Sequence, residues 1–261
     1  MALGKLSVKF APTMPEHLRD PIFLLDSHEK FQPIAVESVE AVPAGLKVPP
    51  KSGDDGAVIP EDKYVDSGEA KLAALPPRGR INFPPGPEAQ EKRLHDEFGG
   101  VGYRRELEDS GVTWVQYWLW YLYNPKTYVG IVGEHEGDWE FVQVGYRDEE
   151  PICMTVSQHH SGGRRLWKDV TLRDGRPLIY VARDSHANFF HPTDEIEAIA
   201  DDADGQGTPL DKLGWRDFGP WASWNGMWGN STGKGRSPDS PGRQAQRWYL
   251  PQSYYEAAER Q

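Results

Sequence analysis

The chain has very little cysteine, because Cys153 is the only one among its 261 residues. A single cysteine excludes an intrachain disulfide and a cysteine-rich zinc cage. Cys153 lies in the apolar run Pro151-Ile152-Cys153-Met154. We therefore expect it to be a buried strand residue rather than a nucleophilic thiol.

Long hydrophobic runs are also missing. No stretch approaches the roughly 18 consecutive apolar residues of a transmembrane helix. The opening residues Met1–Lys5 contain no apolar signal-peptide core. These absences predict a soluble protein, cytoplasmic and without a transmembrane segment.

Positively charged residues are fewer than negatively charged ones. The chain has 29 Lys and Arg against 40 Asp and Glu, a formal net charge of −11. A protein that binds nucleic acid needs a basic surface, and no long Lys/Arg run supplies one here. We expect no nucleic-acid partner, and attraction to an anionic membrane surface is disfavoured for the same reason.

Turn-forming and aromatic residues are abundant, with 27 Gly, 22 Pro and ten Trp. The aromatic rings can build a sizeable core although only 38% of the residues are hydrophobic. Residues 43–100 are dense in Pro, Gly and charge, which predicts a long loop excursion. Within it, Glu88–Phe98 is predicted to form a short helix.

Short runs rich in aromatic and β-branched residues dominate the rest of the chain. They are separated by Gly, Asp, Pro and Ser clusters, and comprise Thr113–Tyr123, Trp139–Tyr146, Ile152–Gln158 and Leu178–Arg183. This spacing favours a sandwich or barrel over alternating α/β units. The predicted fold is all-β: a single-domain antiparallel β-sandwich over residues 1–261, with long Pro/Gly-rich loops and a few short helices.

The densest polar cluster is Gly133-Glu134-His135-Glu136-Gly137-Asp138-Trp139-Glu140. On a strand, Asp138 and Glu140 point to one face, and His135 lies just upstream. His135, Asp138 and Glu140 are therefore candidate ligands of a divalent cation, with Mg²⁺ or Ca²⁺ expected first and Mn²⁺ or Zn²⁺ as alternatives. The same side chains, with Glu136, can instead act as a general acid and base. A solvated acidic turn is the structural alternative.

Histidines also follow two other strand-like runs. His159 and His160 precede the pair Gly162-Gly163, and Asp184-Ser185-His186 follows Leu178–Arg183. Binding and catalytic sites are commonly assembled from loops at one end of a β scaffold. His159, His186, Glu136 and Asp184 are the candidate catalytic residues, and His160 is a candidate for substrate binding. For each histidine alone, a hydrogen-bonded structural role is the alternative.

Tryptophans Trp221 and Trp224 fall in a Gly-rich tract. They can line a groove for a sugar or lipid, or they can pack the long loop onto the sandwich. The familiar motifs for other chemistries are missing: no G-x-S-x-G elbow, no H-E-x-x-H zinc pattern and no phosphate loop.

The motif Gly133–Glu140, followed by Ser157-Gln158-His159 and Tyr180–Ala187, resembles the vacuolar protein sorting 62 family. Leu24–Pro33 and Ser237–Gly242 are similar to the beginning and end of that family. More distantly, His135–Glu140 is similar to the heptapeptide of the necrosis- and ethylene-inducing cytolysins. That resemblance implies a β-sandwich with a divalent cation at His135, Asp138 and Glu140. The cytolysins have a further aspartate where this chain has Thr127, so Glu134, Glu136 or a downstream histidine would have to replace it.

Two functions from different classes follow. The first is an intracellular enzyme in which a cation-assisted carboxylate/histidine site hydrolyses, isomerises or eliminates from a small molecule. In this enzyme hypothesis, His159 and His186 transfer protons to and from the substrate. The alternative is a cation-dependent binding protein for a glycan or a lipid headgroup, with loop tryptophans stacked on the ligand. An interaction scaffold whose acidic motif only rigidifies the sandwich is a third possibility.

Overall fold

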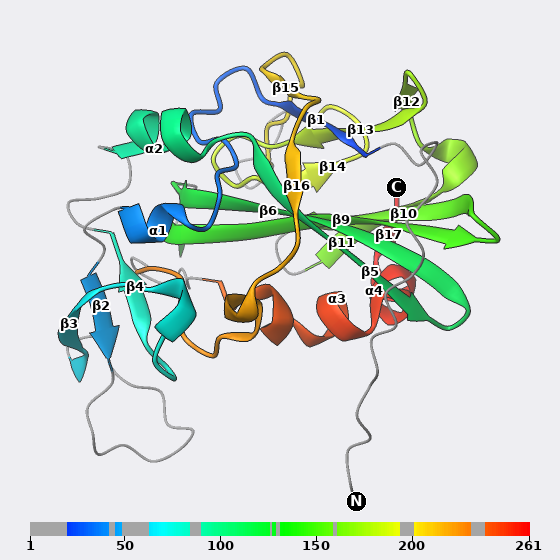
Figure 1. Ribbon diagram of the computed structural model, residues 1–261. Coiled ribbons are helices and arrows are strands. Elements are labelled where there is room, and N and C mark those ends of the chain that lie inside the picture. Colours follow the sequence, from blue (N-terminus) through cyan, green and yellow to red (C-terminus); the bar gives the residue numbers. More distant parts are fainter. Residues whose placement is uncertain are drawn as a thin grey trace, which may run out of the picture.

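A computed structural model describes residues 20–41, 45–48, 63–83, 90–125, 127–128, 131–158, 161–193, 201–230 and 238–261. It contains two large β-sheets, a small three-stranded sheet and several short helices (Figure 1). Within the described residues, no helix is long and apolar enough to cross a membrane.

A seven-stranded sheet runs through the middle of the molecule. Its strands, in spatial order, are β16 (Gly214–Arg216), β5 (Val101–Asp109), β6 (Val112–Asn124), β9 (His135–Arg147), β10 (Glu150–Gln158), β11 (Ser161–Leu166) and β17 (Glu259–Arg260). The five inner strands pair antiparallel. The two short edge strands β16 and β17 pair parallel to their neighbours.

A second sheet covers one face of the first. Its strands are β12 (Leu172–Arg173), β13 (Arg176–Val181), β1 (Ile22–Leu25) and β15 (Pro209–Leu210), with β14 (Asn188–Phe189) on β13. Apolar side chains of both sheets meet in one buried cluster that includes Phe23, Val115, Tyr117, Val142 and Ile179. The fold is therefore mainly β, a sandwich with a few short helices, as predicted. Its ladders are not all antiparallel, because β1 and β13 run parallel.

The other face of the seven-stranded sheet is also covered. The C-terminal helices α3 (Ala245–Tyr249) and α4 (Pro251–Ala257) lie beneath it in Figure 1. The buried side chain of Gln116 donates to the carbonyl of Arg247 (2.5 Å), and that of Gln143 donates to the carbonyl of Pro251 (3.0 Å). An aromatic cluster that includes Trp118, Trp139, Trp221 and Trp228 fills this second core. Because β6 is buried on both faces, its sequence is apolar at nearly every position.

The predicted strands are confirmed, since β6, β9, β10 and β13 each contain most or all of the corresponding run. The helix predicted over Glu88–Phe98 is α2 (Glu91–Phe98). Between residues 43 and 100 the described parts hold more regular structure than the sequence indicated: β2 (Gly45–Val48), β3 (Val65–Glu69) and β4 (Arg80–Asn82) form a sheet. These strands are short, and one of them is wholly exposed, so none has a marked apolar pattern.

The remaining elements are small. They are α1 (Ser38–Ala41), the 3-10 turns η2 (Leu72–Ala74), η4 (Trp167–Asp169), η5 (Pro220–Ser223) and η6 (Pro241–Arg243), and the ribbon of β7 (Thr127–Tyr128) and β8 (Ile131–Val132).

Candidate functional site

The parallel pairing of β1 and β13 brings two polar loops to one edge of the sandwich. Leu25 pairs with Val181, so both strands end side by side. The loop after β1 carries Asp26, His28 and Glu29, and the loop after β13 carries Asp184 and His186. Carboxyl ends of parallel strands are a common place for polar sites. Strand β9 starts with the His135–Glu140 motif and contributes Asp138 to the same region.

His186 is enclosed between two carboxylates. Its Nδ1 lies 2.9 Å from Asp138 Oδ2, and its Nε2 lies 3.7 Å from Glu29 Oε1. The side chains of His186 and Glu29 are fully buried, and that of Asp138 is 8% exposed. The imidazole stacks on the Tyr121 ring, with centroids 3.8 Å apart and an interplanar angle of 4°. The imidazole of His186 therefore has no open face toward solvent.

The two carboxylates determine the charge of His186. Burial by itself lowers the pKa of the imidazole, but the charges of Glu29 and Asp138, together with the hydrogen bond to Asp138, outweigh it and raise the pKa to about 10. Burial raises the pKa of the Asp138 carboxyl, but the bonds to His186 and Asn124 lower it below its usual value overall. The pKa of Glu29 is lowered in the same way, against the effect of its burial. At neutral pH the group is an imidazolium between two carboxylates.

Backbone amides hold Glu29 in place. Its carboxylate accepts hydrogen bonds from the N–H groups of Phe31 (2.6 Å) and Asp184 (2.5 Å). Asp184 and His186 both adopt positive φ, at 65° and 54°, and this tight turn directs the Asp184 N–H at Glu29. The Asp184 carboxylate instead faces Arg183, 3.8 Å from its Nε. Asp184, predicted to be catalytic, thus contributes its backbone to this network.

Asp138 and Glu140 share one face of β9, as expected for positions two apart. Asp138 lies opposite Tyr121 and Glu140 opposite Leu119 on β6. Their carboxylates have different partners, because Asp138 accepts from Asn124 Nδ2 (3.1 Å) and contacts His186, whereas Glu140 accepts from the Ser157 hydroxyl.

The side chains of His135 and Glu136, the remaining polar residues of the His135–Glu140 motif, have other partners. His135 Nδ1 lies 2.8 Å from the Gly137 carbonyl. Glu136 accepts hydrogen bonds from the backbone N–H groups of Asn230 (2.8 Å) and Phe83 (3.2 Å). Burial raises the pKa of the Glu136 carboxyl. Gly137 has φ +69°, which interrupts the regular alternation of side chains between Glu136 and Asp138.

Other predicted site residues lie apart from this network or beyond the described ranges. His159 and His160 lie outside the described residues. Trp221 and Trp224 are 6% and 7% exposed in the aromatic core, which favours the packing alternative. The assignment of His135, Asp138 and Glu140 as cation ligands stays a prediction. Within the described ranges these three are not among the groups whose ligand atoms converge.

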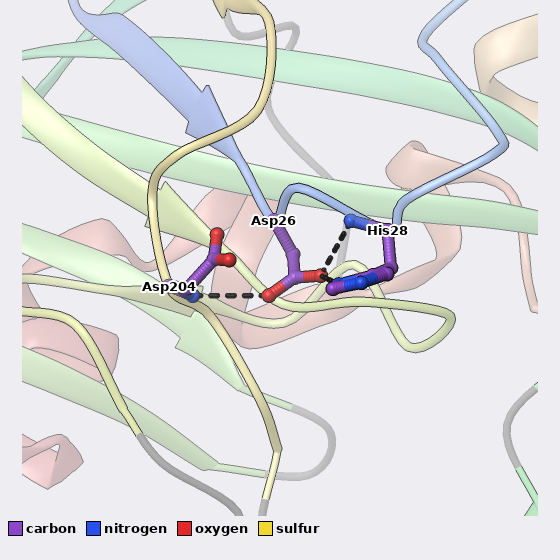
Figure 2. Close-up of side chains that lie close together, drawn as sticks. All are labelled: Asp26, His28 and Asp204. Carbon is purple, nitrogen blue, oxygen red and sulfur yellow. Dashed lines mark hydrogen bonds and ion pairs between the residues drawn. The ribbon is translucent and has the colours of Figure 1, made fainter.

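A different group does converge. Among the described residues, Asp26, His28 and Asp204 each offer a ligand atom, and these atoms lie within 4.8 Å of one another. Figure 2 shows the Asp26 carboxylate between the other two residues. It accepts from the backbone N–H of His28 (2.9 Å) and of Asp204 (3.0 Å), while the His28 Nδ1 lies 3.6 Å away.

Hydrogen bonds orient the Asp204 carboxylate as well. It accepts from the N–H of Ser27 (2.8 Å), the N–H of Gln206 (2.8 Å) and the Ser27 hydroxyl (2.5 Å). Burial raises the pKa of this carboxyl, but these bonds together lower it below its usual value overall. Each carboxylate oxygen can accept more than one interaction, so a cation can still bind beside these hydrogen bonds. Oxygen ligands with one imidazole nitrogen suit a divalent cation such as Mn²⁺ or Zn²⁺, and Ca²⁺ or Mg²⁺ if water completes the shell.

Comparison with known proteins adds a weak likeness of fold. No family model matches the chain, and no curated protein matches it. Among solved structures it is similar to NLPPya in complex with glucosamine, at 20% identity over 41% of this chain and 50% of that one, with a TM-score of 0.31. It is also similar to necrosis and ethylene inducing protein 2 from the agent of cocoa's witches' broom disease, at 15% identity over 77% and 72% of the two chains, with a TM-score of 0.38.

NLPPya in complex with mannosamine is a third similar structure, at 18% identity over 74% and 75% of the chains, with a TM-score of 0.34. The neighbours are thus necrosis-inducing, cytolysin-like proteins. At such low TM-scores the likeness carries no conclusion about ligand or activity. The resemblance to the vacuolar protein sorting 62 family stays a prediction.

Proposed function

We propose that this protein binds a glycan or a lipid headgroup through a divalent cation, and that it does not use His186 for proton transfer. The observation that carries the proposal is the contrast between the two histidine clusters at one edge of the sandwich. His186 is enclosed and paired on both sides, whereas the side chain of His28 is 74% exposed beside two aligned carboxylates.

A proton-transfer group needs access to substrate and a pKa near the working pH. His186 has neither, since its side chain is fully buried and two carboxylates raise its pKa to about 10. The network is better suited to holding the two loops together, because Glu29 joins the loop after β1 to the loop after β13. The network around His186 therefore holds the loop that carries Asp26 and His28 in place, and its own side chains do not contact a ligand.

Asp26, His28 and Asp204 would hold the cation. A bound divalent cation supplies positive charge that oxygen atoms of a ligand can coordinate. Sugar hydroxyls and headgroup phosphates are oxygen donors of this kind, which is why these ligand classes are proposed.

The test is calorimetric titration of metal-free protein with Ca²⁺, Mg²⁺, Mn²⁺ and Zn²⁺, followed by glucosamine or mannosamine with and without the metal that binds best. We expect one saturable metal site, and sugar binding that depends on the metal. The variants His28→Ala and Asp204→Asn should lower metal affinity at least about tenfold, because each removes one ligand from a small set. Asp211→Asn, which removes an exposed carboxylate, is the matched control.

Saturable metal binding that is unchanged in both variants would refute the site. Metal binding without any metal-dependent binding of sugar, or of vesicles that carry anionic or glycosylated headgroups, would refute the function.

A further inference from the structure

Arg105 is a partly buried arginine whose positive charge has no counterpart in the described part of the chain. It lies on β5 opposite Gln116 of β6. Its Nη1 is buried without a hydrogen-bond partner. No ion pair or hydrogen bond joins the Arg105 guanidinium to another described residue.

The neighbouring Arg104 is in a different environment. Arg104, the preceding residue, has its Nη2 2.8 Å from Glu106 and its Nη1 3.6 Å from Asp20. Carboxylates are plentiful, because the chain has 40 acidic and 29 basic residues. Burial lowers the pKa of Arg105 to about 10, and among the described residues the charge of Tyr249 partly offsets this. An unpaired guanidinium at this depth is costly for the folded protein unless an anion binds to it.

The surroundings of Arg105 leave one edge of its guanidinium available for hydrogen bonds. The guanidinium lies over the Trp248 ring, with its Cζ 3.7 Å from the ring centroid. Stacking uses the flat face of the guanidinium. Because Nη1 is buried, the edge that can bind a carboxylate or phosphate through two bonds is the one formed by Nε and Nη2, neither of which is among the buried atoms without a partner. The Trp248 ring also contacts the rings of Phe218 and Trp118 edge to face, at centroid distances of 4.8 Å and 5.8 Å.

Apolar surface adjoins this edge. Tyr249 and Leu250 follow Trp248 directly and are 54% and 48% exposed, two of only five large hydrophobic residues so exposed among those described. The Tyr249 side chain lies close enough to Arg105 to interact with its charge, and an exposed ring beside this guanidinium suits a ligand with an anionic end and an apolar end.

We propose that Arg105, Trp248 and Tyr249 form a binding site for an organic oxyanion, namely a carboxylate or phosphate attached to an aromatic or other apolar group. The site lies on β5 and α3, and it does not depend on the cation-dependent function proposed above. Arg105 binds the oxyanion, Trp248 fixes the plane of the guanidinium, and Tyr249 contacts the apolar part.

The experiment titrates the full chain with four probes: phenyl phosphate, phenylacetate, inorganic phosphate and acetate. Binding is followed by calorimetry and by the NMR signal of the Trp248 indole N–H. We expect at least one aromatic probe to bind saturably at a single site, about tenfold or more tightly than the matching small anion. The tighter of the two aromatic probes identifies the anionic group as phosphate or carboxylate.

Two substitutions and one control test the role of Arg105. Arg105→Met should weaken binding at least about tenfold, and Arg105→Lys should do so too, because an ammonium group cannot form the planar pair of bonds. Arg147→Met removes the same charge from an exposed residue and should leave affinity within about twofold. Arg105→Met removes an unpaired charge, so we expect it to fold with an unchanged or higher Tm. Failure of both aromatic probes to bind saturably, or equal binding by wild type and either Arg105 variant, would overturn the proposal.

Discussion

The imidazole of His186 lies flat on the ring of Tyr121, with the two centroids 3.8 Å apart and the planes within 4°. The two residues come from different sheets, because Tyr121 is on β6 and His186 follows β13. Asp138, opposite Tyr121 on β9, completes the contact through its bond to His186 Nδ1. The arrangement fixes the loop after β13 against the central sheet and forms the base of the edge where Asp26, His28 and Asp204 lie.

Replacing Asp138 tests how much the buried Asp138–His186 pair contributes to the stability of the fold. Asp138→Asn keeps the shape of the side chain but leaves the His186 imidazolium with Glu29 alone. We expect the free energy of unfolding at pH 7 to fall by about 3 kcal/mol, since removing one partner leaves a buried charge uncompensated. Urea denaturation measures this. Asp148→Asn, at an exposed turn residue, is the control and should change stability by less than about 0.5 kcal/mol. Equal effects of the two substitutions would contradict the importance of the pair.

The raised pKa of His186 predicts a particular dependence of stability on pH. The unfolded imidazole releases its proton near pH 6.5, whereas the folded one keeps it up to a pKa of about 10. Between these values the folded state binds more protons, so its stability falls as pH rises. The contribution of His186 is complete below about pH 6.5, given the unfolded pKa. Asp138 and Glu29, whose pKa values are lowered, contribute in the opposite direction and lose their effect in acid.

Denaturation curves measured from pH 5 to pH 10 should therefore show a decline in wild type above neutral pH that is reduced in His186→Gln. A decline of the same steepness in both proteins would show that other groups cause it.

Gly137 is required by the backbone of the His135–Glu140 motif. Its φ of +69° is unfavourable for other residues, and a Cβ there would lie 2.3 Å from the Trp228 carbonyl oxygen and 2.5 Å from the Trp120 ring. We expect Gly137→Ala to lower the free energy of unfolding by more than about 2 kcal/mol. Gly111→Ala has a similar φ of +74° but nothing within 4 Å, so it should cost only about 1 kcal/mol. Similar losses in the two variants would show that the close approach to Trp228 is unimportant.

Trp221 distinguishes packing from ligand binding. The ring stacks on Trp139, with centroids 5.6 Å apart and an angle of 16°, and is 6% exposed. Trp221→Ala should destabilise the fold by about 3 kcal/mol or more. Trp221→Phe, which keeps an aromatic ring, should retain more of the stability and leave sugar affinity as in wild type. Loss of sugar binding in a stably folded Trp221→Phe protein would instead favour a ligand contact.

The strands of the sandwich were predictable because their apolar and aromatic runs are long enough to stand out, as in β6 and β9. The shared face of Asp138 and Glu140 followed from strand periodicity alone. The pairing of β1 with β13 was not predictable, since the two strands lie far apart in the chain and are joined by a parallel ladder. For this reason Asp26, His28 and Glu29 were not recognised as site residues, although they directly follow an apolar strand.

Which groups a side chain contacts depends on the local path of the backbone, and residue types alone do not reveal that path. The turn at Gly137 directs Glu136 to the N–H groups of Phe83 and Asn230. Asp204 lies beside Asp26 and His28 only because it is close to the end of β1 in space, where Ser27 donates to it. A paired and enclosed His186 has the same sequence signature as a catalytic one, namely a histidine beside an acidic residue at a strand end.

The most direct test of the proposed function is to locate the metal. Mn²⁺ is paramagnetic and broadens the NMR signals of nearby amides, so substoichiometric Mn²⁺ can be added to ¹⁵N-labelled protein. The account predicts selective loss of the Ser27, His28 and Gln206 amide signals, and recovery of these signals in His28→Ala. Broadening centred on His135 and Asp138, or none at any amide, would contradict it.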